Sequence, residues 1–199
     1  KTAIVRSKLY GLLGPVKKAP AMLSASGGVD PWHNATSKYA FESISVPASF
    51  KRSVDRVFHR LNLAGASNKA QYKRVLTYDE SVLGLDDVDY VEAIPRSTSP
   101  GYPYSLNCKG KGKQMWFGTE PEYDMSNPNA IKLKEEVLEK EALLHHSRGD
   151  FIFTDFLKDE VRSIERVNAG KTRMVSGCPM DLSLLTRKYY AGFAGWIMQ

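Results

Sequence analysis

Residues 158–175 read KDEVRSIERVNAGKTRMV and carry more ordered charge than any other stretch of the chain. The five cations are Lys158, Arg162, Arg166, Lys171 and Arg173. Residues of equal parity share one face of an extended chain, so each arm would present its cations on a single side. The Asn-Ala-Gly interruption tolerates the positive φ of a tight reversal, which predicts a turn over residues 167–171. The stretch therefore predicts a basic β-hairpin that faces an anionic partner.

Two other interpretations of this stretch start from its charge and its glycine. A solvated surface hairpin with internal salt bridges is equally compatible with the charges, because Asp159, Glu160 and Glu165 dilute the cations. A phosphate-binding P-loop is excluded, because the Gly-Lys-Thr at 170–172 copies its end but Glu165 stands where the pattern needs glycine.

A second informative stretch runs over residues 97–104, where two prolines flank Gly101 and two tyrosines alternate with proline. These residue types predict a bent, rigid loop rather than a helix. Hydroxyls, an approachable glycine and aromatic rings suit a surface that guides a nucleic-acid strand by its phosphates and sugars. The alternative is a Pro-Gly turn whose tyrosines pack locally.

Both stretches resemble motifs of one protein family. Residues 158–175 resemble motif F of the RNA-dependent RNA polymerases of picornavirus-like positive-strand RNA viruses, where a Lys-Asp-Glu-x-Arg arm precedes a Gly-Lys-x-Arg arm. Residues 98–103 resemble motif G of the same polymerases, with its Thr-Ser-x-Gly-Tyr-Pro. The residue pattern of motif F and of the loop at 108–113 most resembles the polymerases of insect picorna-like viruses such as dicistroviruses or iflaviruses.

The resemblance implies two groups of binding residues. Nucleotide-binding residues would be Lys158, Arg162, Arg166, Lys171 and Arg173, with the first, third and fifth nearest the triphosphate. Template-binding residues would be Thr98, Ser99, Gly101, Tyr102 and Pro103. The implied partners are single-stranded RNA, nucleoside triphosphates, and the palm and thumb of the same polymerase, acting in a viral replication complex in the host cytoplasm.

In this family the chemistry belongs to palm aspartates that hold two Mg²⁺ or Mn²⁺ ions, in Asp-x4-Asp and Gly-Asp-Asp patterns. The sequence contains no Gly-Asp-Asp, and its Asp150 and Asp155 have the first spacing but precede motif F, whereas the family places that pair after it. We therefore expect residues 1–199 to be a fingers part without palm or thumb. It would hold no catalytic residue, metal site or cofactor, and would be inactive alone.

Composition bounds the fold. With 199 residues, 42% of them hydrophobic, the chain can bury one core, and its net charge of +6 suits a polyanionic partner. The family resemblance, together with the helices and strands expected below, implies an α+β fold with helices around a short mixed sheet. Its two cysteines predict neither a disulfide framework nor a zinc site, and no apolar run approaches a membrane span. Two other function classes stay open: a non-enzymatic basic RNA-binding module and a structural scaffold without RNA affinity.

Local patterns predict an extended arm and loop over residues 1–47 and a fingers body over residues 48–199. Apolar spacing and capping residues predict helices near 50–61, with Gly65 as the stop, near 77–85 and near 127–144, and a further helix capped by Asp181. That last helix would bury the stripe Leu182, Leu185, Tyr189, Phe193 and Trp196. Residues 151–157 are apolar on both faces, which predicts a buried strand. The lysines at 109–113 predict a flexible cationic loop, which either attracts a nearby phosphate backbone by long-range electrostatics or is simply solvated.

Overall fold

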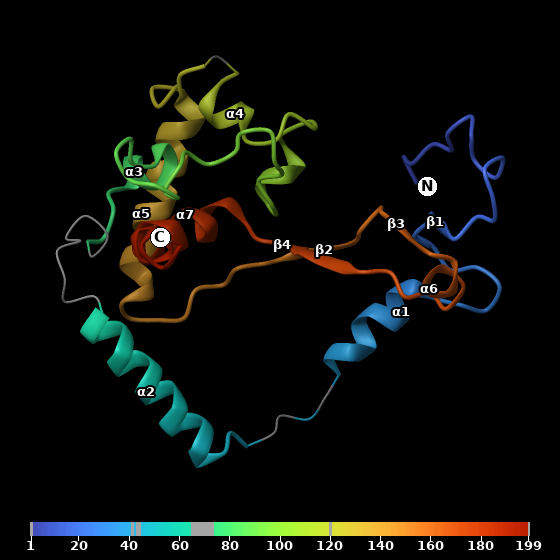
Figure 1. The fold of residues 1–199 in the computed structure, drawn as a ribbon. Helices are drawn as coiled ribbons and strands as arrows, with labels where there is room; N and C mark the ends of the chain where they lie inside the picture. Colours follow the sequence, from blue (N-terminus) through green and yellow to red (C-terminus); the bar gives the residue numbers. More distant parts are fainter. Residues whose placement is uncertain (1, 41, 43–44, 65–73, 120, 199) are drawn as a thin grey trace. The chain divides into compact units, whose positions relative to one another are not determined.

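The computed structural model has an α+β fold and describes all residues except 1, 41, 43–44, 65–73, 120 and 199 (Figure 1). The chain forms two compact units. The first combines residues 1–45 with residues 155–177, and the second combines residues 46–154 with residues 178–199. The predicted division placed residues 155–177 in the body, whereas their contacts join them to the amino-terminal arm.

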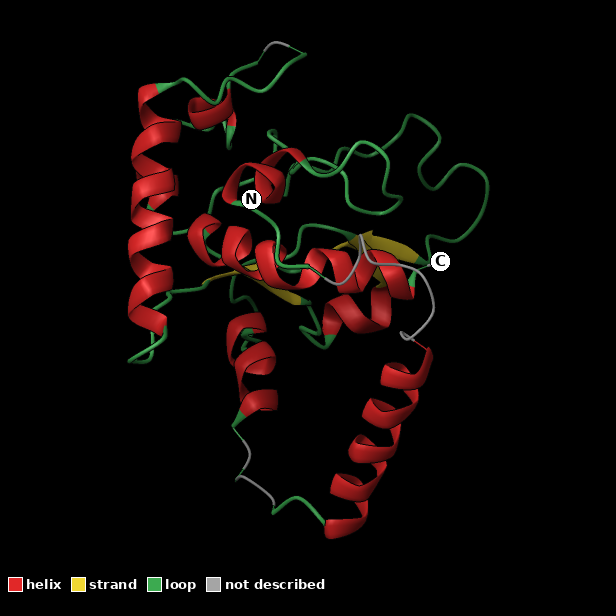
Figure 2. Cartoon of the chain, turned by 90° about the vertical axis from the view of Figure 1, so that its left-hand side faces the viewer, coloured by secondary structure: helices red, strands yellow, loops and turns green. Residues whose placement is uncertain are grey.

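The first unit is built from short elements. They are β1 (Lys18–Pro20), α1 (Pro31–Thr36), η1 (Ser37–Tyr39), β2 (Thr154–Leu157), β3 (Val161–Ser163), α6 (Ile164–Asn168) and β4 (Met174–Gly177). Strands β1 and β3 form one antiparallel pair, and β2 and β4 form a second two-stranded sheet (Figure 2). The described residues therefore carry two small sheets instead of the single sheet expected.

The predicted β-hairpin over residues 158–173 is wrong in its pairing. Its first arm, β3, pairs with β1, while β4 pairs with β2. The one-and-a-half-turn helix α6 lies between them, so Arg166 is on a helix. A reversal does occur where the glycine predicted it, since Gly170 has φ +60°. Parity within the arms could not reveal that β3 and β4 pair with β1 and β2 instead of with each other.

Residues 24–47 were predicted as loop, yet they contain helix α1. The Asp30 carboxylate accepts hydrogen bonds from Trp32 N at 2.8 Å and His33 N at 3.3 Å, and Pro31 occupies the first helical position. An N-cap followed by proline is a known start signal. Six residues are too few to show an apolar period, which is why pattern analysis missed the helix.

The second unit is mainly helical. Its elements are α2 (Ala48–Ala64), α3 (Tyr78–Leu83), η3 (Tyr104–Leu106), α4 (Gln114–Phe117), α5 (Pro128–Leu144) and α7 (Met180–Ile197). The capping box of Thr77 and Glu80 is confirmed at α3, and Asn127 caps α5 with Pro128 at its first position. Gly65, the expected stop of α2, lies outside the described residues.

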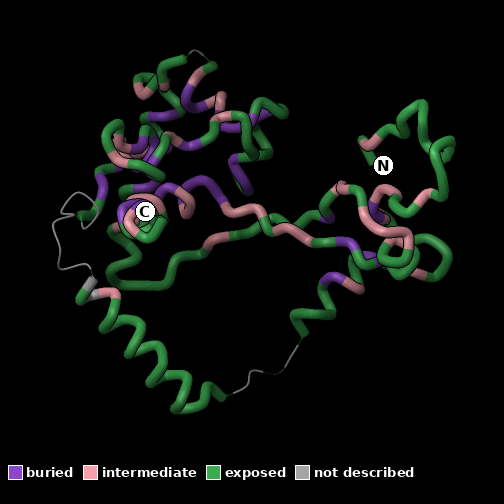
Figure 3. Tube along the Cα trace, in the orientation of Figure 1, coloured by how far each residue is buried: buried purple, intermediate pink, exposed green. Residues whose placement is uncertain are grey.

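Helices α3, α4, α5 and α7 share one hydrophobic core (Figure 3). Its most deeply buried large side chains include Val82, Phe117, Leu133, Met180 and Leu184. Helix α7 buries Leu184, Leu185 and Ala191, whereas Tyr189 and Phe193 of the predicted stripe are 42% and 44% exposed. Of the five predicted positions only Leu185 is buried, Leu182 and Trp196 are half-buried, and the prediction is wrong for Tyr189 and Phe193.

Asp181 does not cap α7. Pro179 is the N-cap residue, and Asp181 lies in the first helical turn with its side chain 2% exposed. The carboxylate forms an ion pair with Lys140 of α5 and accepts a hydrogen bond from Leu182 N at 2.7 Å. A buried carboxylate needs such partners, so the pair fixes α7 against α5.

The buried strand predicted over residues 151–157 is also wrong. Strand β2 begins at Thr154, and only Leu157 of the stretch is buried, while Phe153 and Phe156 are 49% and 48% exposed. The apolar face of α2 is similarly open, with Phe50 and Phe58 exposed. Apolar patterning reports which side chains favour burial but not what covers them. No helix in the described part of the chain is long and apolar enough to cross a membrane.

Candidate functional site

The amino-terminal arm holds the cationic segment through its backbone. The β1–β3 register pairs Lys18 with Ser163, Ala19 with Arg162 and Pro20 with Val161. Hydrogen bonds extend the pairing at both ends, since Ala21 N donates to Glu160 O at 2.8 Å and Ile164 N donates to Lys17 O at 3.2 Å. Because a ladder fixes register, it also fixes the face on which Glu160 and Arg162 lie.

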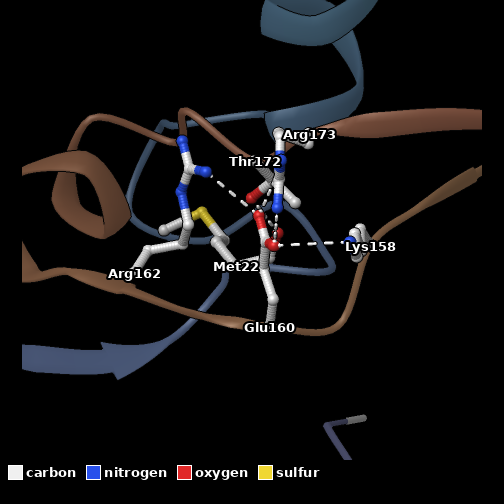
Figure 4. Close-up of polar contacts among 6 residues, drawn as sticks. All are labelled: Met22, Lys158, Glu160, Arg162, Thr172 and Arg173. Carbon is white, nitrogen blue, oxygen red and sulfur yellow. Dashed lines mark hydrogen bonds and ion pairs between the residues drawn. The ribbon is translucent and has the colours of Figure 1, made fainter. Parts of the chain in front are cut away.

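Glu160 lies among three of the five predicted cations (Figure 4). Arg173 grips its carboxylate at two points, with Nε 2.7 Å from Oε1 and Nη2 on Oε2. Arg162 Nη1 donates to Oε1 at 3.0 Å, and Lys158 Nζ lies 3.8 Å from Oε2. The hydrogen bond from Arg173, followed by the charges of all three cations, lowers the pKa of Glu160 from 4.5 to about 2. One carboxylate cannot neutralise three cations, so the cluster keeps positive charge.

The members of this cluster differ in exposure. The side chains of Glu160 and Arg162 are 15% and 16% exposed, whereas those of Lys158 and Arg173 are 48% and 56% exposed. Arg162 Nε is buried without a hydrogen-bond partner among the described residues. The inner pair is thus fixed by the fold, while the two outer cations face solvent.

The loop that follows α6 is fitted closely to the amino-terminal arm. A Cβ on Gly170 would lie 2.4 Å from Val29 Cγ1 and 2.9 Å from Asn34 Nδ2, so only glycine fits. Asn34 Nδ2 donates to Ala169 O at 3.2 Å. Thr172 is buried and donates from Oγ1 to Met22 O at 2.7 Å. Its neighbours on either side are therefore turned outward, as strand parity predicted for the second arm.

These contacts create an open, positively charged pocket of about 440 Å³. Its charged lining residues are Lys38, Arg162, Glu165, Arg166, Lys171 and Arg173. The structure thus brings four of the five predicted nucleotide-binding residues to one pocket, and Lys158 lies outside it on the other side of Glu160. Lys38, on η1, was missed because nothing in the local sequence links it to residues 158–173.

The loop at residues 97–104 is held in place by the backbone of residues 178–180. Gly101 is buried with φ +71°, and a Cβ on it would lie 2.5 Å from Cys178 O. Met180 N donates to Pro100 O at 2.8 Å, and Ser105 N donates to Gly101 O at 2.7 Å. The sequence predicted that Gly101 would let a surface partner approach closely. In the structure, the backbone that approaches Gly101 is the protein's own.

The two tyrosines of this loop have different surroundings. Tyr104 is buried and meets the Trp116 ring edge to face, with centroids 5.8 Å apart. Tyr102 is 38% exposed, and the peptide bond that joins it to Pro103 is cis. Thr98, Ser99, Tyr102 and Pro103 are all exposed, so four of the five predicted template-binding residues lie at the surface. One tyrosine supports the loop while the other remains accessible.

The acidic side chains form no metal site in the described part of the chain, where no cluster of three or more His, Cys, Asp or Glu is suited to bind a metal ion. Asp155 Oδ1 accepts a hydrogen bond from Ser176 Oγ at 2.5 Å, across the β2–β4 pair. The Asp155 carboxylate therefore links the two strands of the second small sheet, β2 and β4, through this hydrogen bond.

Comparison with known proteins identifies the family. The family model described as viral RNA-dependent RNA polymerase matches residues 27–199. The chain belongs to this polymerase family. It is 34% identical to the replicase polyprotein of Drosophila C virus over 99% of this chain, and 35% identical to that of acute bee paralysis virus over all of it. These matches confirm the expected resemblance to polymerases of insect picorna-like viruses.

A solved polymerase supports the same assignment. The Sicinivirus 3Dpol RNA dependent RNA polymerase matches 98% of this chain with a TM-score of 0.75 and 25% sequence identity. That polymerase therefore shares the α+β arrangement of this chain. The chain spans 38% of that polymerase, and 12% and 10% of the two replicase polyproteins.

Proposed function

We propose that the chain is the fingers part of an RNA-directed RNA polymerase that replicates a viral genome. In this proposal the pocket beside Glu160 binds the incoming nucleotide's triphosphate, and the exposed edge of residues 98–103 guides the template strand. The replicating enzyme works in the host cytoplasm within a replication complex, with palm and thumb supplied by the rest of the polymerase.

The observation that carries the nucleotide role is the convergence of Arg162, Arg166, Lys171 and Arg173 on one pocket. Phosphate oxygens accept charge-assisted hydrogen bonds, and the guanidinium fork suits them in pairs. Positive charge fixed beside a triphosphate stabilises the negative charge that develops when the pyrophosphate leaves.

Glu160 gives this pocket an internal anion. Its carboxylate holds Arg173 and Arg162 in place before any nucleotide is bound. Prepositioned charge costs little reorganisation when the substrate arrives. A triphosphate would share these cations with Glu160 rather than displace it, because each guanidinium has donors besides those that Glu160 occupies.

The proposed template role rests on a rigid loop with exposed groups. Ser99, Tyr102 and Pro103 present a hydroxyl, a ring and an apolar ring edge to solvent. Phosphate and sugar contacts of this kind position a strand without reading its sequence. The same surface would therefore accept any template base, which replication of a whole genome requires.

Two-metal catalysis is proposed only for the complete polymerase. The described carboxylates do not fit such a centre, since none of them form a metal-binding cluster and Asp155 is engaged with Ser176. The carboxylates that bind Mg²⁺ or Mn²⁺ would have to come from outside residues 1–199. We accordingly propose that this chain alone transfers no nucleotide.

A crossed experiment tests the proposed function in a full-length polymerase that contains these residues. One variant combines Lys171→Ala with Arg173→Ala, and another is Tyr102→Ala. The first should raise the nucleotide KM with little change in template Kd, and the second should weaken template binding with little change in nucleotide KM. A basic RNA-binding module predicts instead that the double variant mainly loses RNA affinity, with a steep salt dependence. A scaffold predicts that neither parameter changes.

A further inference from the structure

The last lysine of the Lys-Gly-Lys-Gly-Lys loop is not part of a solvated cationic loop. Lys113 is 9% exposed, whereas Lys109 and Lys111 of the same run are exposed. Its side chain turns inward and reaches the loop that carries Thr98 and Ser99. A buried ammonium is costly unless oxygen atoms replace the water it loses.

Residues 97–104, which include the proposed template-binding residues, are called the template loop. Three of its oxygens surround the Lys113 ammonium. Nζ lies 2.5 Å from Thr98 Oγ1, 2.9 Å from Ser99 O and 3.4 Å from Thr98 O. An ammonium has three hydrogens to donate, so these acceptors can use all of them. Burial lowers the pKa of Lys113, and the three oxygens oppose that effect by favouring the charged form. The side chain thus ties two consecutive residues of the loop to one point.

The backbone before Lys113 fits the same loop. Gly112 is buried with φ +61°, and a Cβ on it would lie 2.8 Å from Thr98 O and 2.9 Å from both Arg96 O and Ser97 O. Lys113 N also donates to Thr98 O at 3.2 Å. Residues 112–113 therefore pack directly against residues 96–99 and support them.

The hydroxyls of Thr98 and Ser99 differ in the hydrogen bonds that they make within the protein. Thr98 Oγ1 donates its hydrogen to Pro95 O at 2.8 Å and accepts from Lys113, so it has no hydrogen left to donate. Ser99 Oγ accepts from Gly101 N at 3.2 Å, and its own hydrogen has no acceptor in the described part of the chain. Because Ser99 is exposed, its hydroxyl can donate to a phosphate oxygen.

We propose that Lys113 is a positioning residue of the template loop, which fixes Thr98 and Ser99 so that the Ser99 hydroxyl, and not that of Thr98, contacts a phosphate of the template RNA. This inference rests on the proposed template role of residues 98–103. It assigns Lys113 an internal task, in contrast to the long-range electrostatic role that the sequence of the loop first suggested.

The test is a double-variant cycle in the full-length polymerase with a single-stranded RNA template. Ser99→Ala, Lys113→Met and their combination are compared by template Kd, nucleotide KM and thermal melting. Ser99→Ala should weaken template binding about threefold to thirtyfold in the parent enzyme, and less than twofold in the Lys113→Met background. Nucleotide KM should stay within about twofold throughout, and thermal melting shows whether each variant is folded.

Two further variants make the test specific. Lys111→Met removes the same charge from an exposed position, and Ser99→Ala should keep its full effect in that background. Thr98→Val removes one acceptor of the ammonium with little change in volume, and it replaces Lys113→Met in the cycle if that variant does not fold. In the Lys113→Met background and in the Thr98→Val background, the effect of Ser99→Ala should shrink to less than about twofold.

The outcomes separate this inference from the proposed function. If Ser99→Ala costs the same in the parent and in the Lys113→Met or Thr98→Val background, Lys113 does not position Ser99, although the loop still binds template. If Ser99→Ala and Tyr102→Ala both leave template Kd unchanged in the parent enzyme, the template role itself is wrong and the inference is lost with it.

Discussion

Arg173 and Glu160, which lie 13 residues apart in sequence, form a two-point ion pair at the centre of the cationic cluster. The carboxylate side of the pair is largely buried, and the guanidinium side is largely exposed. The acid therefore acts as a fixed support, and the Arg173 guanidinium is presented to solvent in one orientation. This geometry combines both hypotheses for the segment: Arg173 takes part in a salt bridge and also lines the proposed nucleotide pocket.

The first prediction concerns Arg173 itself. In the full-length polymerase, Arg173→Ala should lower kcat/KM for nucleotides about thirtyfold to a thousandfold, because it removes a charge-assisted contact to the triphosphate. Arg173→Lys should recover only part of the loss, since a point charge cannot reproduce the planar fork. Steady-state kinetics with each variant measure both effects.

Lys132→Ala is the matched control for Arg173. Lys132 is an exposed cation on α5 whose side chain lies 3.9 Å from Glu136, and its removal should leave nucleotide kinetics unaffected. If Arg173→Ala lowered only the melting temperature and left kcat/KM unchanged, Arg173 would be a surface salt-bridge partner with no nucleotide role.

The second prediction is a dependence of stability on pH. The hydrogen bond from Arg173 leads the causes that lower the pKa of Glu160 from 4.5 to about 2. A lowered carboxyl pKa stabilises the folded state above the unfolded value, and this contribution is lost as pH falls through the window from about 4.5 to about 2. Glu160→Gln should therefore be less stable than the parent at pH 7, and the gap should close across that window.

Urea unfolding at a series of pH values measures this gap. Glu165→Gln removes an exposed carboxylate from the same segment and is measured in parallel as the control for loss of one negative charge. Glu80, whose pKa is also lowered to about 2 by Arg74 and by Thr77 N, contributes equally to the parent and to both variants. A gap of constant size from pH 7 to pH 2 would contradict the assigned role of Glu160.

Signals that act over three or four residues were readable from the sequence. Thr77 and Glu80 form the capping box that their spacing predicted, and Asn127 with Pro128 starts a helix where expected. These signals are satisfied by neighbouring backbone groups, so no distant partner is needed. The motif match of residues 98–103 and 158–173 similarly sufficed to predict the family, which the comparisons confirm.

Features that depend on distant partners were not readable. Strand β3 pairs with β1 across more than a hundred residues, and Lys38 reaches the cationic pocket from a segment predicted as loop. Lys113 and the exposed Lys111 each follow a glycine in the same run of alternating lysines, yet tertiary contacts bury Lys113. Apolar residues at 151–157 predicted burial, but the two-stranded sheet leaves most of them exposed. The residue type shows whether a side chain favours burial, but the chain topology determines whether other elements cover it.

The third prediction concerns the ion pair between Lys140 and Asp181. The Asp181 side chain is 2% exposed and that of Lys140 is 39% exposed, so Lys140→Met would leave a buried carboxylate without its cation. We expect a loss of about 1–3 kcal/mol in unfolding free energy, less than for a fully buried pair because Lys140 is partly solvated. Lys132→Met, at an exposed pair on the same helix, should cost about 0–0.5 kcal/mol. Equal losses for the two variants in urea unfolding would contradict a stabilising role of the buried pair.

The last prediction links the amino-terminal arm to nucleotide binding through Gly170. Gly170→Ala should strain the backbone at φ +60° and also force Cβ against Val29 and Asn34. Gly27→Ala is the matched control, because Gly27 has φ +57° in the same unit but open space around its Cβ position. Both variants should lose about 1–2 kcal/mol from the left-handed conformation, and Gly170→Ala should lose about 1–3 kcal/mol more from overpacking.

The functional consequence of Gly170→Ala should exceed that of the control as well. Pushing the loop away from Val29 would displace Lys171, which follows at once, and the pocket it lines. In the full-length polymerase, nucleotide KM should rise about tenfold or more for Gly170→Ala, since small displacements of positioning groups are costly. It should rise less than about twofold for Gly27→Ala. Equal KM values for the two variants would mean that the fit between the arm and the loop supports folding only and does not set the position of the cations.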